Sequence, residues 1–106
     1  MKFALITLLA TASFAAQAEF KTGNKLYQQI TGNHGEYMNA IGYVTGVADA
    51  LNGAIACPPE SVTAGQLMDM TKLYLENYPS TRHLSADAII SRIMSVTWPC
   101  KKGPSL

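Results

Sequence analysis

Residues 37–57, with the sequence YMNAIGYVTGVADALNGAIAC, decide the fold of this chain. Apolar side chains recur in this stretch at steps of three and four residues, which is the spacing of a helix face packed against a core. The stripe consists of Tyr37, Ile41, Val44, Ala48, Leu51 and Ile55. We therefore expect one long helix over Tyr37–Cys57, ending where Pro58 and Pro59 prevent its continuation.

The opposite side of that helix carries three glycines, Gly42, Gly46 and Gly53, with Asp49 between them. Each glycine in a helix interior costs roughly 1 kcal/mol relative to alanine, so a compensating contact is expected. Because a surface without side chains allows another backbone to approach closely, these glycines are a candidate dimer or close-packing strip. The alternative is a glycine-rich core helix with no second contact, and geometry alone leaves both open.

The first 18 residues have the features of a secretory signal peptide. Lys2 precedes an apolar run from Phe3 to Ala16, and Ala16-Gln17-Ala18 is the small-x-small pattern after which signal peptidase cleaves. The run is shorter than the ~20 residues needed to span a bilayer. We expect cleavage after Ala18, which leaves residues 19–106 as one exported domain without membrane insertion. The alternative is an uncleaved N-terminal anchor.

Charges are sparse and balanced in the remaining domain. The chain has eight Lys and Arg against seven Asp and Glu, so loss of Lys2 makes the two sets equal, and only 14% of the residues are charged. The sequence has no basic patch of the kind that binds nucleic acid, and no lysine-rich amphipathic segment for a membrane surface. A surface so poor in charge tends to be covered by a partner.

Cys57 and Cys100 are the two cysteines of the chain. In an exported protein an even cysteine count favours a disulfide. This bridge would close a loop of roughly 44 residues, which the chain-entropy model values at about 4 kcal/mol. A metal site lacks ligands, because His34 and His83 are isolated and no Cys-x-x-Cys or His-x-x-x-His spacing occurs. We predict a structural disulfide, no metal and no cofactor.

Two further helices are expected on either side of the long one. A short helix over Phe20–Thr31 is followed by a turn at Gly32–Gly35 that leaves His34 in solvent. Another begins at Thr63, where the side chains of Thr63 and Gln66 fit a capping box. Its inner face should carry Leu67, Met70, Thr71, Tyr74 and Tyr78, and its outer face Asp69, Lys72 and Glu76.

A last helix is expected after the turn that follows Pro79. Ser85 is its predicted N-cap, and its inner stripe should consist of Ile89, Ile93 and Val96, with Ala86 beside it. It ends at Trp98-Pro99, directly before Cys100. The predicted fold is therefore all-α: a small four-helix domain in which one disulfide links the C-terminal ends of the second and last helices.

No catalytic constellation is recognisable in the sequence. There is no G-x-S-x-G elbow, no glycine-rich phosphate cradle, and no local pair of carboxylates. His83 and Asp87 are four residues apart at a helix start, but no third group accompanies them. We expect a protein that binds another protein and is not an enzyme.

Five motifs follow one another along the chain. They are Gly23–Leu26, GYVTGVADA at Gly42–Ala50, Cys57-Pro58-Pro59 leading to VTAGQLMD at Val62–Asp69, YLENYPSTRHLSA at Tyr74–Ala86, and Trp98-Pro99-Cys100. Together they resemble the Rap/Tai family of immunity proteins, which protect bacteria against type VI secretion amidases. The resemblance implies a small helical periplasmic protein, commonly a homodimer. Such a protein binds a peptidoglycan-cleaving amidase of the cysteine-histidine type and blocks its active-site cleft.

The chain departs from this family in one respect. Family members often have a second cysteine pair that joins the first helix to the central one, and the matching positions here are Ile30 and Ala40. The first helix is therefore expected to be held by packing alone.

A protein that blocks a cleft needs protruding residues, and the turn at Tyr78–His83 offers the best candidates. Tyrosine and arginine are enriched at interface hot spots, which favours Tyr78 and Arg82, with His83 beside them. Arg82 is expected to be exposed and to contribute little to folding. A second candidate surface is the outer face formed by Asp69, Lys72 and Glu76. The alternative is that Tyr78 completes the core stripe and Arg82 is merely solvated.

Two other functions fit a small exported helical domain. One is a periplasmic acid-stress chaperone, which needs titrating carboxylates, and seven acids with two histidines are a modest supply. The other is an inhibitor of a different cell-wall hydrolase, such as lysozyme.

Overall fold

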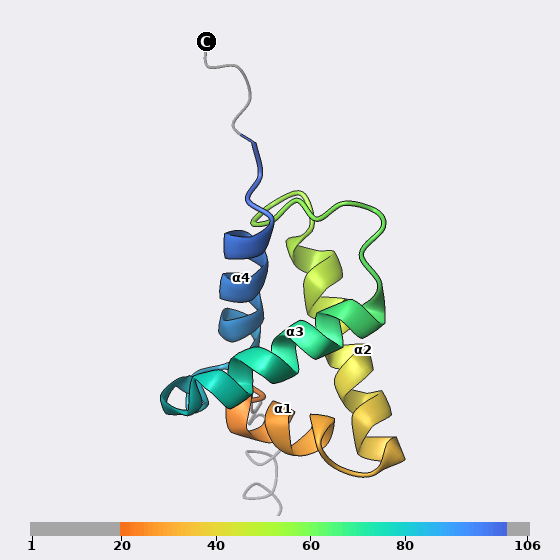
Figure 1. Ribbon diagram of the computed structural model, residues 1–106, viewed down its shortest axis with the longest axis vertical. Coiled ribbons are helices and arrows are strands. Elements are labelled where there is room, and N and C mark those ends of the chain that lie inside the picture. Colours follow the sequence, from red (N-terminus) through yellow and green to blue (C-terminus); the bar gives the residue numbers. More distant parts are fainter. Residues whose placement is uncertain (1–19, 102–106) are drawn as a thin grey trace, which may run out of the picture.

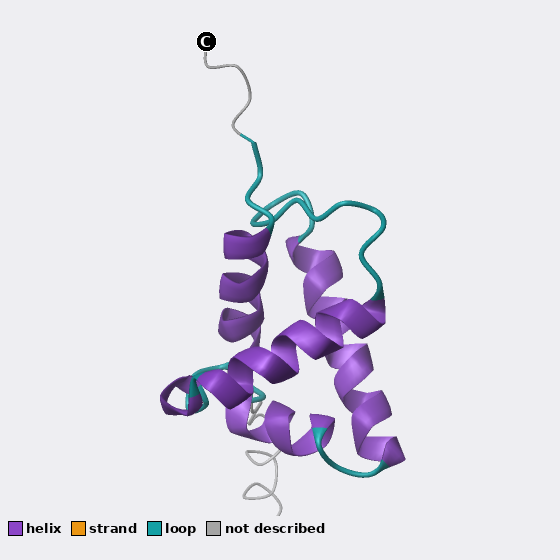
Figure 2. Cartoon of the chain, viewed as in Figure 1, coloured by secondary structure: helices purple, strands orange, loops and turns teal. Residues whose placement is uncertain are grey.

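The computed structural model describes residues 20–101, which form four α-helices and one short 3₁₀ helix (Figures 1 and 2). The elements are α1 (Gly23–Ile30), α2 (His34–Leu51), α3 (Ala64–Asn77), the 3₁₀ helix η2 (Pro79–Thr81) and α4 (Ala86–Thr97). Residues 20–101 contain no strand, and the predicted all-α fold with four helices is confirmed. The predicted signal peptide, residues 1–18, and the end of the predicted tail, residues 102–106, lie outside the described residues.

The four helices enclose one core. In Figure 1, α3 crosses in front of α2 and passes the lower end of α4, and α1 lies across the lower end of the molecule. Each helix contacts the other three. The largest side chains that are fully buried come from all four helices: Leu26, Val44, Met68, Thr71, Leu75, Ile90 and Met94.

Helix α2 begins at His34, three residues before the first residue of the predicted helix. The reason is a capping box formed by Asn33 and Glu36, which was not predicted from the sequence. The Asn33 side chain accepts a hydrogen bond from the Glu36 N–H at 2.9 Å, and the Glu36 carboxylate accepts one from the Asn33 N–H at 3.1 Å. These bonds satisfy two backbone groups that a helix start leaves without partners. His34 is exposed as expected, but it is the first residue of a helix and not part of a turn.

Helix α2 ends at Leu51, so the predicted continuation to Cys57 is wrong. Gly53 has a φ of 85°, a left-handed conformation that glycine adopts easily and that commonly ends a helix. Gly53 is therefore a turn residue and not a member of a helical glycine strip. Of the predicted core stripe, Val44 is fully buried, whereas Ile55 lies beyond the helix end and is 48% exposed.

Helix α3 begins as predicted but presents a different face to the core. The capping box is present: Thr63 Oγ1 accepts from the Gln66 N–H at 3.1 Å, and Gln66 Oε1 accepts from the Thr63 N–H at 2.8 Å. The buried residues are Met68, Thr71 and Leu75, of which only Thr71 was predicted. The other predicted members, Leu67, Met70 and Tyr74, are half-buried, and Tyr78 is exposed. The buried face of α3 is therefore centred about one residue away from the apolar stripe predicted from the sequence.

Helix α4 also differs from its predicted form in two respects. Ser85 occupies the N-cap position, but its side chain makes no capping hydrogen bond; the N–H of Ala86 instead donates to the carbonyl of Lys21 at 2.8 Å. Val96, predicted to be in the core, lies at the edge of the inner face and is 69% exposed. The buried residues are Ala86, Ile89, Ile90, Ile93 and Met94.

The predicted disulfide between Cys57 and Cys100 is present, with the two Cα atoms 4.8 Å apart. Neither cysteine directly follows a helix. Residues 52–56 separate Cys57 from α2, and Trp98 and Pro99 separate Cys100 from α4. The Cys57 N–H donates to the Trp98 carbonyl at 2.8 Å, beside the bridge. The disulfide thus ties the segment after α2 to the segment after α4.

Helix α1 is held by backbone hydrogen bonds as well as by packing, so the expectation of packing alone is wrong. Ile30 and Ala40, which occupy the positions of the missing cysteine pair, are both buried. The Gly23 N–H donates to the Leu84 carbonyl at 2.8 Å. A Cβ at Gly23 would lie 2.9 Å from the carbonyl oxygen of Arg82, so this close approach requires glycine.

Lys21 adds a further link between the start of the domain and α2. Its ammonium donates to the side-chain oxygens of Gln29 at 2.6 Å and Asn39 at 3.0 Å, and it lies 4.5 Å from the centre of the Tyr43 ring. Burial lowers the pKa of this ammonium, and the nearby positive charge of Lys25 lowers it further. The two acceptors and the ring face offset part of that cost.

Candidate functional site

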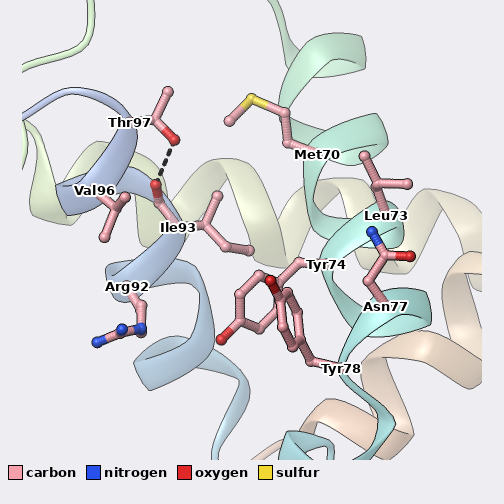
Figure 3. Close-up of a pocket in the computed structure, with 9 residues that line it drawn as sticks. All are labelled: Met70, Leu73, Tyr74, Asn77, Tyr78, Arg92, Ile93, Val96 and Thr97. Atoms are coloured by element: carbon pink, nitrogen blue, oxygen red, sulfur yellow. Dashed lines mark hydrogen bonds between the residues drawn. The ribbon is translucent and has the colours of Figure 1, made fainter.

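A groove of about 470 Å³ lies between α3 and α4 (Figure 3). We call it the α3–α4 groove. Its lining residues are Met70, Leu73, Tyr74, Asn77, Tyr78, Arg92, Ile93, Val96 and Thr97. The two helices lie apart at this point, and side chains from both line the space between them (Figure 3).

The rim of the groove is apolar and exposed. Leu73 is 58% exposed, Tyr78 53% and Val96 69%. Half-buried Met70 and buried Ile93 extend the same apolar surface inward. A cluster of protruding apolar side chains is unusual on a small protein and typically marks an interaction surface.

The polar groups of the groove form few bonds with one another. Among the side chains drawn in Figure 3, the one hydrogen bond runs from Thr97 Oγ1 to the Ile93 carbonyl at 2.7 Å. The rings of Tyr74 and Tyr78 pack with their centres 4.7 Å apart and tilted by 40°. This pair holds the two aromatic side chains against the groove, and their hydroxyl groups remain available to a partner.

Arg92 is the only charged residue among those lining the groove. It is exposed, and within residues 20–101 it forms no salt bridge. The salt bridge found in that part of the chain joins Lys72 to Glu76, 3.9 Å apart, on the outer face of α3. The groove is therefore apolar with one uncompensated positive charge.

The turn at Tyr78–His83 contains η2 and connects α3 to α4. Arg82 is half-buried, so the expectation of an exposed arginine is wrong. Its Nε donates to the Leu75 carbonyl at 2.7 Å, and its guanidinium lies 4.1 Å from the centre of the Tyr27 ring. Arg82 thereby fixes the turn to the end of α3 and to α1. Of the predicted binding residues in this turn, Tyr78 and His83 are the exposed ones.

The predicted outer face of α3 is confirmed as a solvent-facing surface: Asp69, Lys72 and Glu76 are all exposed. The Tyr27 hydroxyl donates to the Glu76 carboxylate at 3.1 Å. Since Tyr27 also stacks against Arg82, it connects the turn with this face. The structure thus brings the two predicted surfaces next to each other at the C-terminal end of α3, where Tyr78 also lines the groove.

Gly42 and Gly46 lie exposed on α2, and a Cβ at either position would meet no atom within 4 Å outside its own helix and chain neighbours. No other element of residues 20–101 therefore covers them. Gly53 does not belong with them, because it lies in the turn after the helix. The strip consists of two glycines one helical turn apart and is open to solvent.

A search of protein families identifies the chain. The family model for Rap1a immunity proteins matches residues 22–100, well over half of the sequence and nearly all of the described domain. The chain belongs to the Rap1a immunity protein family. This confirms the resemblance seen in the five sequence motifs. No curated protein matches the chain.

Membership of this family identifies the chain as an immunity protein, whose partner is a secreted effector protein. Among residues 20–101, no cluster of three or more His, Cys, Asp or Glu could hold a metal ion. Asp87, which lies four residues after His83 in the sequence, accepts a hydrogen bond on its carboxylate from the Ala88 N–H at the start of α4.

No helix in the described part of the chain has the length and apolar character needed to cross a membrane.

Three groove residues of the immunity protein were missed as candidates from sequence. Leu73 and Arg92 were not singled out, and Val96 was assigned to the core. The available indication was helical position: Leu73 lies roughly opposite the buried face formed by Met68 and Leu75. Apolar residues at such positions have no core to enter, so they require another explanation.

Proposed function

We propose that this immunity protein acts in the periplasm, where it binds a peptidoglycan-cleaving amidase effector and occludes its active-site cleft. The observation that carries the proposal is the surface at the C-terminal end of α3. There the turn at Tyr78–His83 projects beyond the helices, at the left of Figure 1. The turn adjoins the exposed apolar rim of the α3–α4 groove, since Tyr78 belongs to both.

Three features of the chain support export and the type of partner. Residues 1–18 have the pattern of a signal peptide. The Cys57–Cys100 disulfide suits an oxidising compartment. The family is one of immunity proteins. The resemblance to the Rap/Tai family implies that the partner is an amidase of the cysteine-histidine type.

We also propose a homodimer in which the glycine strip of α2, Gly42 and Gly46, contacts a second chain. Support comes from the cost of these residues, roughly 1 kcal/mol each relative to alanine, and from the absence of any covering element within residues 20–101. A second backbone can approach such a surface more closely than a surface with side chains.

The test is an inhibition assay with residues 19–106 and a type VI secretion amidase of the cysteine-histidine type. Release of peptidoglycan fragments is measured with increasing amounts of the immunity protein, and calorimetry gives the affinity. We expect inhibition to be complete near one immunity chain per amidase. A lysozyme acting on the same peptidoglycan is the control and should not be affected.

Two outcomes would overturn the proposal. Inhibition of the lysozyme but not of the amidase would assign the protein to the inhibitors of other cell-wall hydrolases. Absence of inhibition, together with suppression of protein aggregation in acid, would instead identify an acid-stress chaperone.

A further inference from the structure

We infer that the α3–α4 groove receives a segment of the effector in which an apolar side chain lies next to a carboxylate. This inference rests on the proposed function and adds the chemistry of a second contact. The turn enters the cleft of the enzyme, while the groove accepts a part of the enzyme. The two contacts are adjacent because Tyr78 belongs to both.

The apolar half of the inference follows from the exposure of the groove. Leu73, Tyr78 and Val96 are each more than half exposed, so more than half of each side chain's accessible surface is still in water. Burial of such surface is the main favourable term in protein association. A partner side chain placed between Leu73 and Val96 would also cover the Tyr74–Tyr78 pair. Buried aromatic anchors of this type are common at the centres of interfaces.

The acidic half follows from the charge of Arg92. Among residues 20–101, those that line the groove include this one charged residue and no carboxylate. If an apolar partner segment covered Arg92 without a counter-charge, the guanidinium would lose water and gain nothing in return. A carboxylate on the partner avoids this penalty and accepts two parallel hydrogen bonds from the guanidinium.

Two other occupants fit the charge less well. In a two-fold dimer the same surface meets itself, so two Arg92 side chains would share one apolar interface without a carboxylate from the groove. The C-terminal end of the chain follows α4 directly, but Lys101 and Lys102 have the same sign as Arg92. An acidic, apolar segment of the effector is the occupant that complements both properties of the groove.

The experiment compares three charge-changing variants by calorimetric titration against the amidase of the inhibition assay. Arg92→Glu reverses the charge of the groove, and Val96→Asp places a carboxylate on its apolar rim. Lys25→Glu is the matched control, because Lys25 is also exposed but lies on α1, outside the groove. We expect Kd to rise at least tenfold for both groove variants and to stay within twofold for the control. Melting temperatures should remain close to that of the wild type, since all three side chains are exposed.

Each result has a distinct meaning. If the wild type does not bind the amidase, the proposed function fails. If the wild type binds and both groove variants bind equally well, the inference fails while the proposed function stands. Light scattering on the same variants provides a further check: dissociation of a wild-type dimer by Arg92→Glu or Val96→Asp would place a second copy in the groove and overturn the inference.

Discussion

The outer face of α2 and the α3–α4 groove are both uncovered, but they expose different chemistry. The α2 face exposes backbone, because Gly42 and Gly46 have no side chains and nothing lies within 4 Å of where a Cβ would be. The groove exposes side chains, with Leu73 and Val96 more than half accessible. Both faces lie on well-capped helices, since α2 and α3 each begin with a capping box.

The difference shows how two contacts can be kept separate on a small domain. A bare helix face gives little apolar area, but it allows close approach of a second helix, which suits a copy of the same chain. A groove with protruding apolar side chains and one positive charge suits a partner with complementary chemistry. A partner bound at one face leaves the other open, so the proposed dimer and the effector complex are compatible.

The largest expected effect comes from the disulfide, which connects the helices that carry the two faces. Cys57→Ala should lower the free energy of unfolding by about 2–5 kcal/mol, because the unfolded chain gains freedom when the loop is opened. Urea denaturation of the variant, with reduced wild type as the control, measures the loss. A variant as stable as the oxidised wild type would show that packing of α2 against α4 suffices without the bridge.

The next largest effect on stability is expected in the turn after α3, at Arg82. Arg82→Ala should destabilise the domain by about 1.5–3 kcal/mol, because it removes a charge-assisted hydrogen bond to the Leu75 carbonyl. His83→Ala is the matched control on the same turn and should change stability by less than about 0.5 kcal/mol, since His83 is exposed. Thermal or urea unfolding measures the stability of both variants relative to the wild type. Equal stability of the two variants would mean that the Arg82 contacts do not persist in solution.

The smallest effect on folding is expected at the α2 face. Gly46→Leu should leave the monomer folded and raise helix stability by roughly 0.5–1 kcal/mol, because leucine has the higher helix propensity and the position is open. The same change should dissociate the proposed dimer, which light scattering detects. Gly53→Ala is the contrast: its φ of 85° makes alanine unfavourable, so this variant should lose stability. A monomeric wild type would remove the support for a dimer at this strip.

Features set by neighbouring residues were predictable from sequence. The Thr63–Gln66 capping box needs only residues three apart, and it is present as predicted. The stop of α3 before Pro79 is equally local. The pairing of Cys57 with Cys100 was predictable for another reason, because a chain with two cysteines allows only one intramolecular bridge.

Predictions that required knowledge of a neighbouring helix were less accurate. Tyr78 and Val96 were placed in the core by helical spacing, yet both are exposed. Spacing identifies an apolar side of a helix but not which part of that side another helix covers. The same limit applies to Arg82. An arginine in a turn is expected to be exposed, but this one donates a hydrogen bond to the Leu75 carbonyl and lies over the Tyr27 ring.

The sequence by itself determined the helical class, the start of α3 at its capping box, the disulfide and the family, because these depend on short-range chemistry or on motif order. Only the tertiary structure decided which faces are buried and which remain open. In the packed domain the buried face of α3 is formed by Met68, Thr71 and Leu75, and Leu73 lies on the rim of a groove. The physical reason is that burial depends on the angle at which helices cross, and that angle is set by all four helices packing around one core.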